Sequence, residues 1–303
     1  MANSPRAVFV TRETDYEQLL GRHATRGQAK FFLDMRGQDI DAIEDRHRAF
    51  GAALHQARGV VPGDWRQALV ARADLDRFLF APEDVIVVVG QDGLVANVAK
   101  YLDGQPVLGL NPAPDLYDGV LVRLGLADLR ELLPASVAGA TPVERRTMVE
   151  ARLDSGERLL ALNEVFVGHR SHQSARYRIA TADAAEDQSS SGLIVASGTG
   201  ATGWARSIAE ATGTALRLEP QERAVDFFVR EPFPSIATGT RLRHGRITGA
   251  PLCVTSRMND GGVIFADGIE RDFLAFDWGR RVTIGPAARC LNLVTGRDAV
   301  TGW

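Results

Sequence analysis

The chain has 303 residues, of which 45% are hydrophobic and 24% charged, with a formal net charge of −3. This length suits two domains or one large one, and the composition is ordinary for a soluble globular protein. The net charge argues against a nucleic-acid binder that relies on neutralising phosphates, and no apolar stretch approaches the length of a membrane span.

The N-terminus and the cysteine and lysine content bear on the cellular location, the state of the thiols and the class of nucleotide site. The first residues lack a charged start followed by an apolar core, so we expect no secretory signal and a cytoplasmic protein. Cys253 and Cys290 form no CxxC pattern, which favours buried, reduced thiols. Lys30 and Lys100 are the only lysines, and the GxxxxGK[ST] motif of a Walker-type P-loop is absent.

The N-terminal third alternates apolar strands with helices. Asp84 to Val89 is a fully apolar run after its first residue, which is typical of a central parallel strand buried on both faces. With the helix and strand that follow, it predicts a right-handed βαβ unit in a doubly wound α/β domain over residues 1–125. The other expected elements are a strand at Ala7–Thr11, an interrupted helical segment at Tyr16–Phe32, a helix at Ile40–Ala57, an apolar segment at Arg66–Phe78, a helix at Leu94–Leu102 and a strand at Pro106–Leu110.

After about residue 125, most of the predicted elements are short strands. Regular spacing with Gly, Asp and Asn between them predicts a β-sandwich-like domain over residues 126–280, with residues 281–303 packing back on the first domain. Asp183 to Ser191 is polar and predicts a surface loop. The expected elements are helices at Leu126–Leu133 and Pro142–Glu150, a hairpin turning at Asp154–Gly156, a helix at Ala205–Ala211, and strands at Val165–Val167, Arg176–Ile179, Gly192–Ala196, Ala224–Val229, Arg241–Ile247, Leu252–Ser256 and Val263–Phe265.

The loop Gly90-Gln-Asp-Gly93 lies at the carboxyl end of the buried strand, the edge where open α/β sheets bind ligands. Its glycines let backbone N–H groups approach phosphates, and the next helix adds its positive end. An acidic residue suits a base that takes a proton from an attacking hydroxyl, although a purely structural turn is the slightly favoured interpretation of this motif alone.

Three further motifs hold polar residues at strand ends. Asn163 and Glu164 stand at the entry to a strand and offer donors and acceptors suited to ribose hydroxyls, although a polar strand end is the favoured interpretation of this pair alone. The segment Gly192–Trp204 runs from an apolar strand into small and hydroxyl residues that end on an aromatic, a costly loop to order without a ligand. Asp267 and Gly268 follow a strand, and a simple turn is the favoured interpretation of that pair.

In this order, the four motifs resemble the NAD kinase family, in which a GGDG loop, an Asn-Glu pair, a Thr-rich loop ending on Tyr and a late Asp-Gly recur. The resemblance runs from about residue 84 to 275, and Arg230-Glu-Pro232 is closer to the divergent, mitochondrial-like branch. It implies a Rossmann-like α/β domain followed by a β-sandwich-like domain.

The resemblance also implies a role for each matching residue. Asp92 would be the catalytic base on the 2′-hydroxyl of the adenosine ribose of NAD, with Gly90, Gln91 and Gly93 as the phosphate loop. ATP would donate the phosphate, with Mg²⁺ carried by its phosphates. The substrate contacts would be Asn163, Glu164, Ser191, Thr199, Gly200, Thr202, Gly203, Trp204 and Ser207, with Asp267 as a further candidate.

Several positions depart from the family pattern. Gln91 replaces a glycine of GGDG, Ser191 stands where an Asp is usual, and Gly198 and Trp204 replace a Pro and the stacking Tyr. These changes keep the carboxylate at position 92 but alter the groups that read the substrate. His169 and His172 have an HxxH spacing without a third ligand, so a solvated loop is favoured there over a metal site.

The resemblance therefore implies a kinase that phosphorylates NAD to NADP and works as a homo-oligomer, a dimer by expectation. We expect no nucleic-acid or membrane partners. Two alternatives stay open. One is a kinase of another nucleoside- or sugar-like substrate, which the changes at Gln91 and Ser191 allow. The other is a non-catalytic dinucleotide sensor, against which the retained carboxylate of Asp92 counts.

Overall fold

The computed structural model describes residues 4–114 and 119–296. The chain divides into two compact units, one formed by Met1–Glu144 with Asn292–Trp303 and the other by Arg145–Leu291. The first unit extends beyond the expected limit at residue 125, because the helix that begins at Leu126 packs its Leu129, Leu132 and Leu133 into that unit's core. The return of the chain to the first unit begins at Asn292, later than the expected residue 281.

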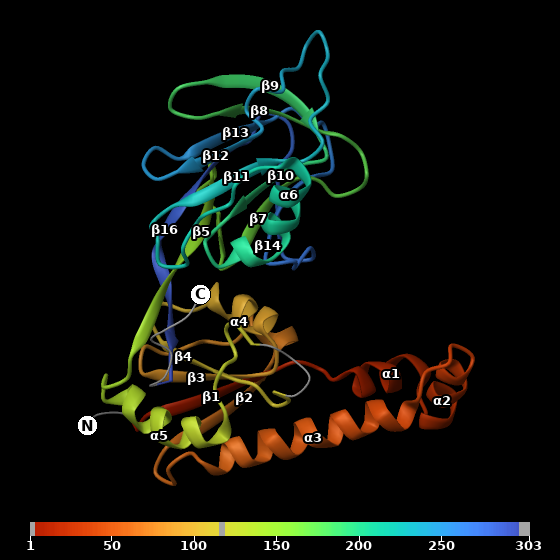
Figure 1. The fold of residues 1–303 in the computed structure, drawn as a ribbon, viewed down its shortest axis with the longest axis vertical. Coiled ribbons are helices and arrows are strands. Elements are labelled where there is room, and N and C mark those ends of the chain that lie inside the picture. Colours follow the sequence, from red (N-terminus) through yellow and green to blue (C-terminus); the bar gives the residue numbers. More distant parts are fainter. Residues whose placement is uncertain (1–3, 115–118, 297–303) are drawn as a thin grey trace. The chain divides into compact units, whose positions relative to one another are not determined.

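The first unit is a parallel sheet covered on both faces by helices (Figure 1). Its strands run in the order β2-β1-β3-β4, and Asn292 and Leu293 of β16 pair with β4. The elements are β1 (Arg6–Thr11), α1 (Asp15–His23), α2 (Arg26–Asp34), α3 (Ile40–Gly59), β2 (Arg66–Ala71), a 3₁₀ turn (Arg72–Asp74), β3 (Asp84–Val89), α4 (Asp92–Ala99), β4 (Pro106–Leu110) and α5 (Leu126–Val137).

Successive side chains of the buried strands point to opposite faces of this sheet. Phe9, Val87 and Leu108 belong to the core shared with α3 and α5, whereas α4 lies on the opposite face (Figure 1). Every residue of β3 is buried, as its apolar run predicted. The expected doubly wound α/β architecture is confirmed.

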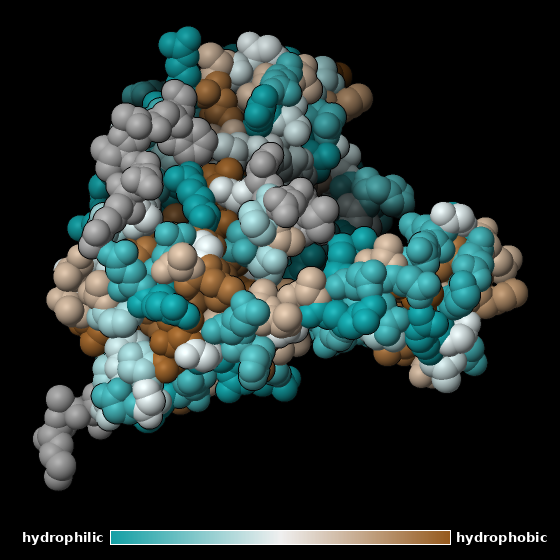
Figure 2. Space-filling model, turned by 60° about the horizontal axis from the view of Figure 1, so that its bottom comes forward, coloured by the Kyte–Doolittle hydropathy of each residue, from teal (hydrophilic) through white to brown (hydrophobic). Residues whose placement is uncertain are grey.

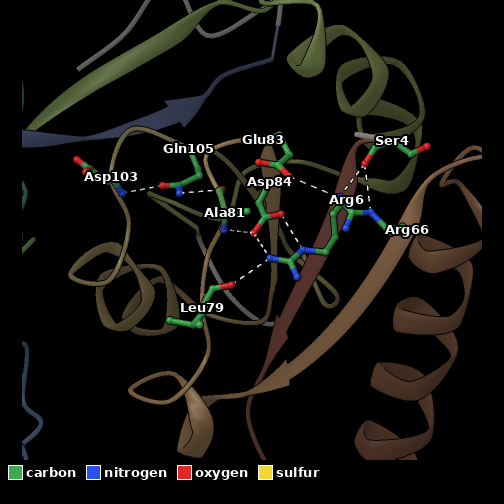
Figure 3. Close-up of polar contacts among 9 residues, drawn as sticks. All are labelled: Ser4, Arg6, Arg66, Leu79, Ala81, Glu83, Asp84, Asp103 and Gln105. Carbon is green, nitrogen blue, oxygen red and sulfur yellow. Dashed lines mark hydrogen bonds and ion pairs between the residues drawn. The ribbon is translucent and has the colours of Figure 1, made fainter. Parts of the chain in front are cut away.

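A buried ion pair fixes the start of β3 against β1. The Asp84 side chain is fully buried and accepts hydrogen bonds from Arg6 Nε at 2.7 Å and Arg6 Nη2 at 2.6 Å (Figure 3). Asp84 also accepts from the N–H of Ala81 at 2.7 Å, and Asp84 raises the pKa of the Arg6 guanidinium. The carboxylate is therefore paired on both oxygens, as a buried charge must be.

A helical arm formed by α1, α2 and the first half of α3 projects from the body of the first unit (Figures 1 and 2). Its small core contains Ala29, Leu33 and Ile40, with aromatic and aliphatic side chains of α1 packed around them. Thr14 caps α1 in a capping box with Glu17. The interrupted helical segment predicted at Tyr16–Phe32 is therefore two helices that fold back on α3.

The second unit is a two-layered β-structure, which confirms the predicted sandwich. One sheet has the order β12-β11-β10-β7-β14-β15, and the other contains β16-β13-β8-β9 with β5 and β6. The elements are β5 (Val143–Leu153), β6 (Arg158–Ala161), β7 (Glu164–His169), β8 (Ala175–Ala180), β9 (Ala185–Ser190), β10 (Leu193–Ala196), a 3₁₀ turn (Gly200–Thr202), α6 (Trp204–Thr212), β11 (Val225–Val229), β12 (His244–Ile247), β13 (Leu252–Ser256), β14 (Gly262–Ala266), β15 (Phe273–Ala275) and β16 (Arg281–Val294).

One core lies between these layers, and α6 covers the outer face of the sheet that contains β10. Val165, Tyr177 and Val254 are among the side chains that meet in the core. On the outer face, Ala205 and Ala209 of α6 pack on Ala196 and Phe228. This outer face also bears the aromatic residues of the candidate site.

Two predictions of local structure in the second unit are wrong. The segment predicted as a helix at Pro142–Glu150 is the start of strand β5. The predicted surface loop at Asp183–Ser191 contains strand β9, whose inward side chains Glu186, Gln188 and Ser190 are polar and buried. In the first unit, Arg66–Phe78 begins as strand β2.

Candidate functional site

The phosphate-loop candidates lie at the junction of β3 and α4. Gly90 has φ +152°, a backbone conformation that favours glycine, and its N–H donates to the carbonyl oxygen of Leu110 on the neighbouring strand. Gln91 is the N-cap of α4 without a capping side-chain hydrogen bond. Gly93 is exposed, and a Cβ there would meet no atom within 4 Å. The first turn of α4 is thus open to a ligand.

Asp92 holds a neighbouring backbone segment with its carboxylate. Oδ1 accepts the N–H groups of Leu121 at 2.8 Å and Val122 at 3.1 Å, and Oδ2 accepts the N–H of Val120 at 2.9 Å. A carboxylate has about four acceptor positions, so one remains on Oδ2. The side chain is rigidly oriented and still able to accept one more hydrogen bond.

Asp267 holds the Asn-Glu motif in the same way. Its carboxylate accepts the N–H groups of Leu162 at 2.9 Å, Asn163 at 2.8 Å and Glu164 at 3.3 Å. Asp267 has φ +49° and Gly268 φ +68°, and the Ile269 N–H donates to the Ala266 carbonyl oxygen. The predicted Asp-Gly turn is confirmed, and its carboxylate joins two motifs that lie about a hundred residues apart.

The loop after β10 is packed against the same Asn-Glu segment. The Ser197 hydroxyl donates to the Leu162 carbonyl oxygen and accepts the N–H groups of Thr199 at 3.1 Å and Gly200 at 3.3 Å. A Cβ on Gly200 would lie 2.2 Å from the Asn163 carbonyl oxygen, so only glycine fits. The structure therefore brings Asn163, Glu164, Thr199, Gly200 and Asp267 together.

A fully buried arginine donates a hydrogen bond to the loop after β10. Arg146 is 0% exposed, and its Nη1 donates to the Thr199 hydroxyl at 3.3 Å. Sequence reasoning missed Arg146, because it was assigned to a helix rather than to β5. Thr202 turns its hydroxyl back to the Thr199 carbonyl oxygen at 3.1 Å, whereas Thr202 and Gly203 are exposed.

The carboxyl group of Glu164 has a raised pKa. Burial, and secondarily the charge of Asp267, raise its pKa from 4.5 to about 7. Among the described residues no group donates a hydrogen bond to its carboxylate. A carboxyl group that is half protonated near neutral pH can both donate to and accept from a ligand hydroxyl.

Trp204 and Arg230 form the centre of two clefts on the outer face of the sheet. The Trp204 ring stacks on Phe166, with centroids 6.1 Å apart and an interplanar angle of 13°, and the Arg230 guanidinium lies 5.1 Å from the Trp204 ring centroid. One cleft, of about 520 Å³, includes Ser191, and the other, of about 730 Å³, includes Ser207. A nucleotide base that stacks on Trp204 must therefore share the indole ring with the guanidinium of Arg230.

The first cleft combines an aromatic floor with a polar rim. Phe166, Trp204 and Phe265 contribute rings, while His169, His172, Arg170, Arg230 and Glu270 contribute ionisable groups. Aromatic surface beside a few polar groups is the usual composition of a small-molecule site. The two histidines of the HxxH spacing thus line a cleft. Among the described residues, no cluster of three or more His, Cys, Asp or Glu side chains could hold a metal ion.

The remaining sequence expectations have simple outcomes. Cys253 and Cys290 form no disulfide bond, and both are partly exposed rather than buried as expected, at positions of β13 and β16 that are not fully covered. Among the helices in the described part of the chain, none is long and apolar enough to span a membrane.

Fold and candidate site together define a two-unit protein, in which a Rossmann-like α/β unit with a GxDG loop accompanies a β-sandwich. No family model matches the sequence. The NAD kinase of Burkholderia pseudomallei is 30% identical over 203 residues, which cover 62% of this chain and 61% of that protein. The NAD kinase of Heliobacterium modesticaldum is 37% identical over 132 residues, or 41% of this chain and 46% of that protein.

Solved structures agree with this assignment at the level of the fold. An NAD kinase from Archaeoglobus fulgidus, solved with ATP, has a TM-score of 0.58 at 19% identity and covers 97% of this chain and 94% of its own. The yeast NADH kinase, solved with NADH, has a TM-score of 0.58 at 14% identity and covers 98% and 85%. The chain is similar in sequence and in fold to NAD kinases. It spans about 61% of the length of the first curated relatives it matches.

Proposed function

We propose that the protein is a kinase that transfers a phosphoryl group from ATP to the 2′-hydroxyl of the adenosine ribose of NAD, forming NADP. Its sequence similarity to NAD kinases supports the reaction, and the likeness to an NAD kinase solved with ATP supports the fold that it needs. The observation that carries the proposal is the carboxylate of Asp92, fixed by three backbone N–H groups with one acceptor position left.

Asp92 would act as the general base. Its Oδ2 takes the proton of the ribose hydroxyl while the hydroxyl oxygen bonds to the γ-phosphorus of ATP and the bond from that phosphorus to ADP breaks. Gly90, Gln91 and Gly93 would receive the phosphates at the first turn of α4. Mg²⁺ would be held chiefly by the nucleotide phosphates and would supply charge neutralisation.

The second unit would read the dinucleotide. Asn163 and Glu164 would hydrogen-bond its ribose hydroxyls, supported by Asp267, and Thr199, Gly200, Thr202 and Gly203 would line its path. Ser191, Trp204 and Ser207 would contact it at the two clefts. The aromatic floor of the cleft at Ser191 supports this assignment, since a nicotinamide or adenine ring needs such a surface.

The direct test mixes purified protein with ATP, Mg²⁺ and NAD and measures NADP. We expect product from the wild type and a loss of roughly 10²–10⁴-fold in rate for Asp92→Asn. Asp128→Asn is the matched control, because Asp128 also accepts a backbone N–H, that of Gly125 at 2.8 Å. Its rate should stay within about twofold of the wild type.

The outcomes separate the alternatives. NAD binding without NADP formation would identify a dinucleotide sensor. ATP consumption only with another acceptor would identify a kinase of a nucleoside- or sugar-like substrate. Thermal unfolding of Asp92→Asn must accompany the assay, since the amide places N–H groups against those of residues 120–122.

We further propose that the protein is a cytoplasmic homodimer. Support comes from the second unit, where the apolar side chains of Phe233 and Ile236 are exposed at 66% and 110% of their reference areas, as at surfaces that pair with another copy. Light scattering on the purified protein tests this, and a mass of one chain at all concentrations would contradict it.

A further inference from the structure

The guanidinium of Arg230 lies on the aromatic surface where a ligand ring would stack. Arg230 lines both clefts beside Trp204, and its Cζ is 5.1 Å from the centroid of the Trp204 ring. Because atoms in contact are about 3.5–4 Å apart, no nucleotide ring fits between the two groups. A ring that stacks on this side of the indole must therefore displace the guanidinium.

The indole is the fixed member of this pair. Trp204 is the first residue of α6, and its ring packs against a small apolar cluster that contains Phe166, Ile194 and Val263. Phe166 stacks on the indole with an interplanar angle of 13°. A packed ring of this kind keeps one orientation, so the ring stays in place while the guanidinium moves.

The side chain of Arg230 is weakly held, although its backbone is fixed. The Arg230 N–H donates to the Gly192 carbonyl oxygen at 2.9 Å, and its carbonyl oxygen accepts the Ser191 N–H at 2.9 Å. The ion pair of the guanidinium with Glu231 is long, at 3.8 Å, and the side chain of Glu231 is 67% exposed. Such a pair contributes little. Within residues 4–114 and 119–296, no group accepts a hydrogen bond from this guanidinium, which itself is only 29% exposed.

The chemistry of a ligand decides whether displacing the guanidinium is favourable. A ligand ring that takes its place removes the cation–π contact, and the displaced cation needs a new partner. A phosphate group supplies one, because its oxygens accept two parallel hydrogen bonds from a guanidinium. A neutral base or sugar carries no charge that could replace the contact. Arg230 should therefore favour a ring that carries phosphate over the same ring without it.

The charges around the indole also favour an anion beside the ring. Basic side chains outnumber acidic ones in the linings of the two clefts. The basic ones are His169, Arg170, His172, Arg230, Arg243 and His244, and the acidic ones are Glu231 and Glu270. The helix that begins at Trp204 has no capping side chain, so its positive end adds to this potential.

We propose that Arg230 is a specificity-determining residue, which leaves the ring of Trp204 for a phosphate of the ligand when a nucleotide ring stacks there. The site then takes nucleotides or dinucleotides in preference to nucleosides. That the ligand is the acceptor of a kinase rests on the proposed function. The role of Arg230 rests on its contact with Trp204 and on its weakly held guanidinium.

Calorimetry on the full chain compares probes that differ only in a phosphate: AMP with adenosine, and nicotinamide mononucleotide with nicotinamide riboside. Trp204→Leu identifies the pair that binds at this site, because binding there depends on the indole. For that pair, the wild type should bind the nucleotide at least about tenfold more tightly than the nucleoside, as for one charged hydrogen bond.

Arg230→Gln should change the two affinities in opposite directions. Binding of the nucleotide should weaken roughly tenfold, whereas binding of the nucleoside should strengthen about two- to fivefold, because the cation–π contact no longer competes. Arg230→Lys should keep part of the preference, since it keeps the charge. Arg243→Gln is the control, because Arg243 lines only the second of these clefts and donates to the Thr240 carbonyl oxygen at 2.8 Å. It should leave both affinities within about twofold.

Steady-state kinetics give a second measurement, in which Arg230→Gln should raise KM for NAD roughly tenfold and leave kcat within about threefold. The gain for the nucleoside requires a folded protein, so a loss of structure cannot imitate the expected result. Affinities for nucleotide and nucleoside that fall together in Arg230→Gln, or that both stay unchanged, would overturn the proposal. So would a wild type that binds none of the four probes through Trp204. A nucleotide preference that depends on Arg230, in a protein that forms no NADP, would uphold the role of Arg230 and remove the proposed function.

Discussion

Two carboxylates, Asp92 and Asp267, have the same structural task in the two units. Each accepts the N–H groups of three consecutive residues, 120–122 for Asp92 and 162–164 for Asp267. A carboxylate suits this task because it has several acceptor positions and no donor. An acidic residue in a phosphate-binding loop is therefore explained in part by the backbone that it fixes, as well as by the chemistry proposed for Asp92.

The raised pKa of Glu164 predicts a dependence of stability on pH. Between about pH 4.5 and 7 the folded chain keeps a proton on Glu164 that the unfolded chain releases, so stability falls as pH rises through this window. Glu164→Gln removes the buried charge. The variant should gain roughly 2 kcal/mol over the wild type at pH 8 and little at pH 4.5, a figure reduced for partial solvent access.

Urea unfolding at the two pH values measures this difference. Glu210→Gln is the control, because Glu210 is exposed on α6 and, within the described part of the chain, pairs with Arg206 alone. A gain for Glu164→Gln that is the same at both pH values would show that the effect is not one of ionisation.

At the scale of single elements, the buried pair between Arg6 and Asp84 ties β1 to the start of β3. Asp84→Ala leaves the Ala81 N–H unpaired and the part-buried guanidinium of Arg6 without its carboxylate, and should cost about 3 kcal/mol of unfolding free energy. Glu83→Ala removes the neighbouring exposed pair with Arg66 at 3.5 Å, and should cost less than about 1 kcal/mol. Urea unfolding of both variants tests the contrast, and equal losses would contradict it.

The loop after β10 depends on the close approach of Gly200 to the Asn-Glu segment. Gly200→Ala should cost about 1–3 kcal/mol of stability and weaken NAD binding, because the new methyl group meets a backbone carbonyl oxygen. In Gly203→Ala the nearest atom would lie 3.7 Å away, so stability should change by less than about 1 kcal/mol. Calorimetric titration with NAD, together with unfolding, tests both variants. A Gly200→Ala protein that binds NAD as the wild type does would show that the packing of this loop is not required.

Apolar periodicity predicted the elements whose inward residues are apolar, such as β3 and β10. It missed β9, an edge strand, because its buried side chains are polar and hydrogen-bonded: Gln188 donates to the Leu242 carbonyl oxygen at 3.0 Å, and Glu186 accepts the Leu242 N–H at 2.9 Å. It missed the start of β5 for the same reason, since Arg146 and Thr147 are buried there. A strand that buries polar groups leaves no hydrophobic pattern in the sequence.

The candidate site was predictable in its motifs but not in its contacts. Asp92 and Asp267 stood out as acidic residues in glycine turns, yet nothing in the local sequence specifies which distant N–H groups they hold. The pairing of Trp204 with Phe166 and Arg230 likewise joins separate strands. Such partners are fixed by the register of the sheets, which a single sequence does not reveal.

At the scale of the whole molecule, each unit has its own hydrophobic core. One core includes Phe9, Val87 and Leu129 in the first unit, and the other includes Val165, Tyr177 and Val254 in the second. The chain crosses between the units within β5 and again within β16. Separate cores of this size can each unfold cooperatively.

Scanning calorimetry of the full chain should therefore show two unfolding transitions. Asp84→Ala should lower the midpoint of one transition by several degrees and Gly200→Ala the midpoint of the other, because each destabilises a different core by more than about 1 kcal/mol. Glu83→Ala and Gly203→Ala are the matched controls and should leave both midpoints within about 2 °C. A single transition that both destabilising variants lower together would contradict this, and would show that the two cores unfold as one cooperative unit.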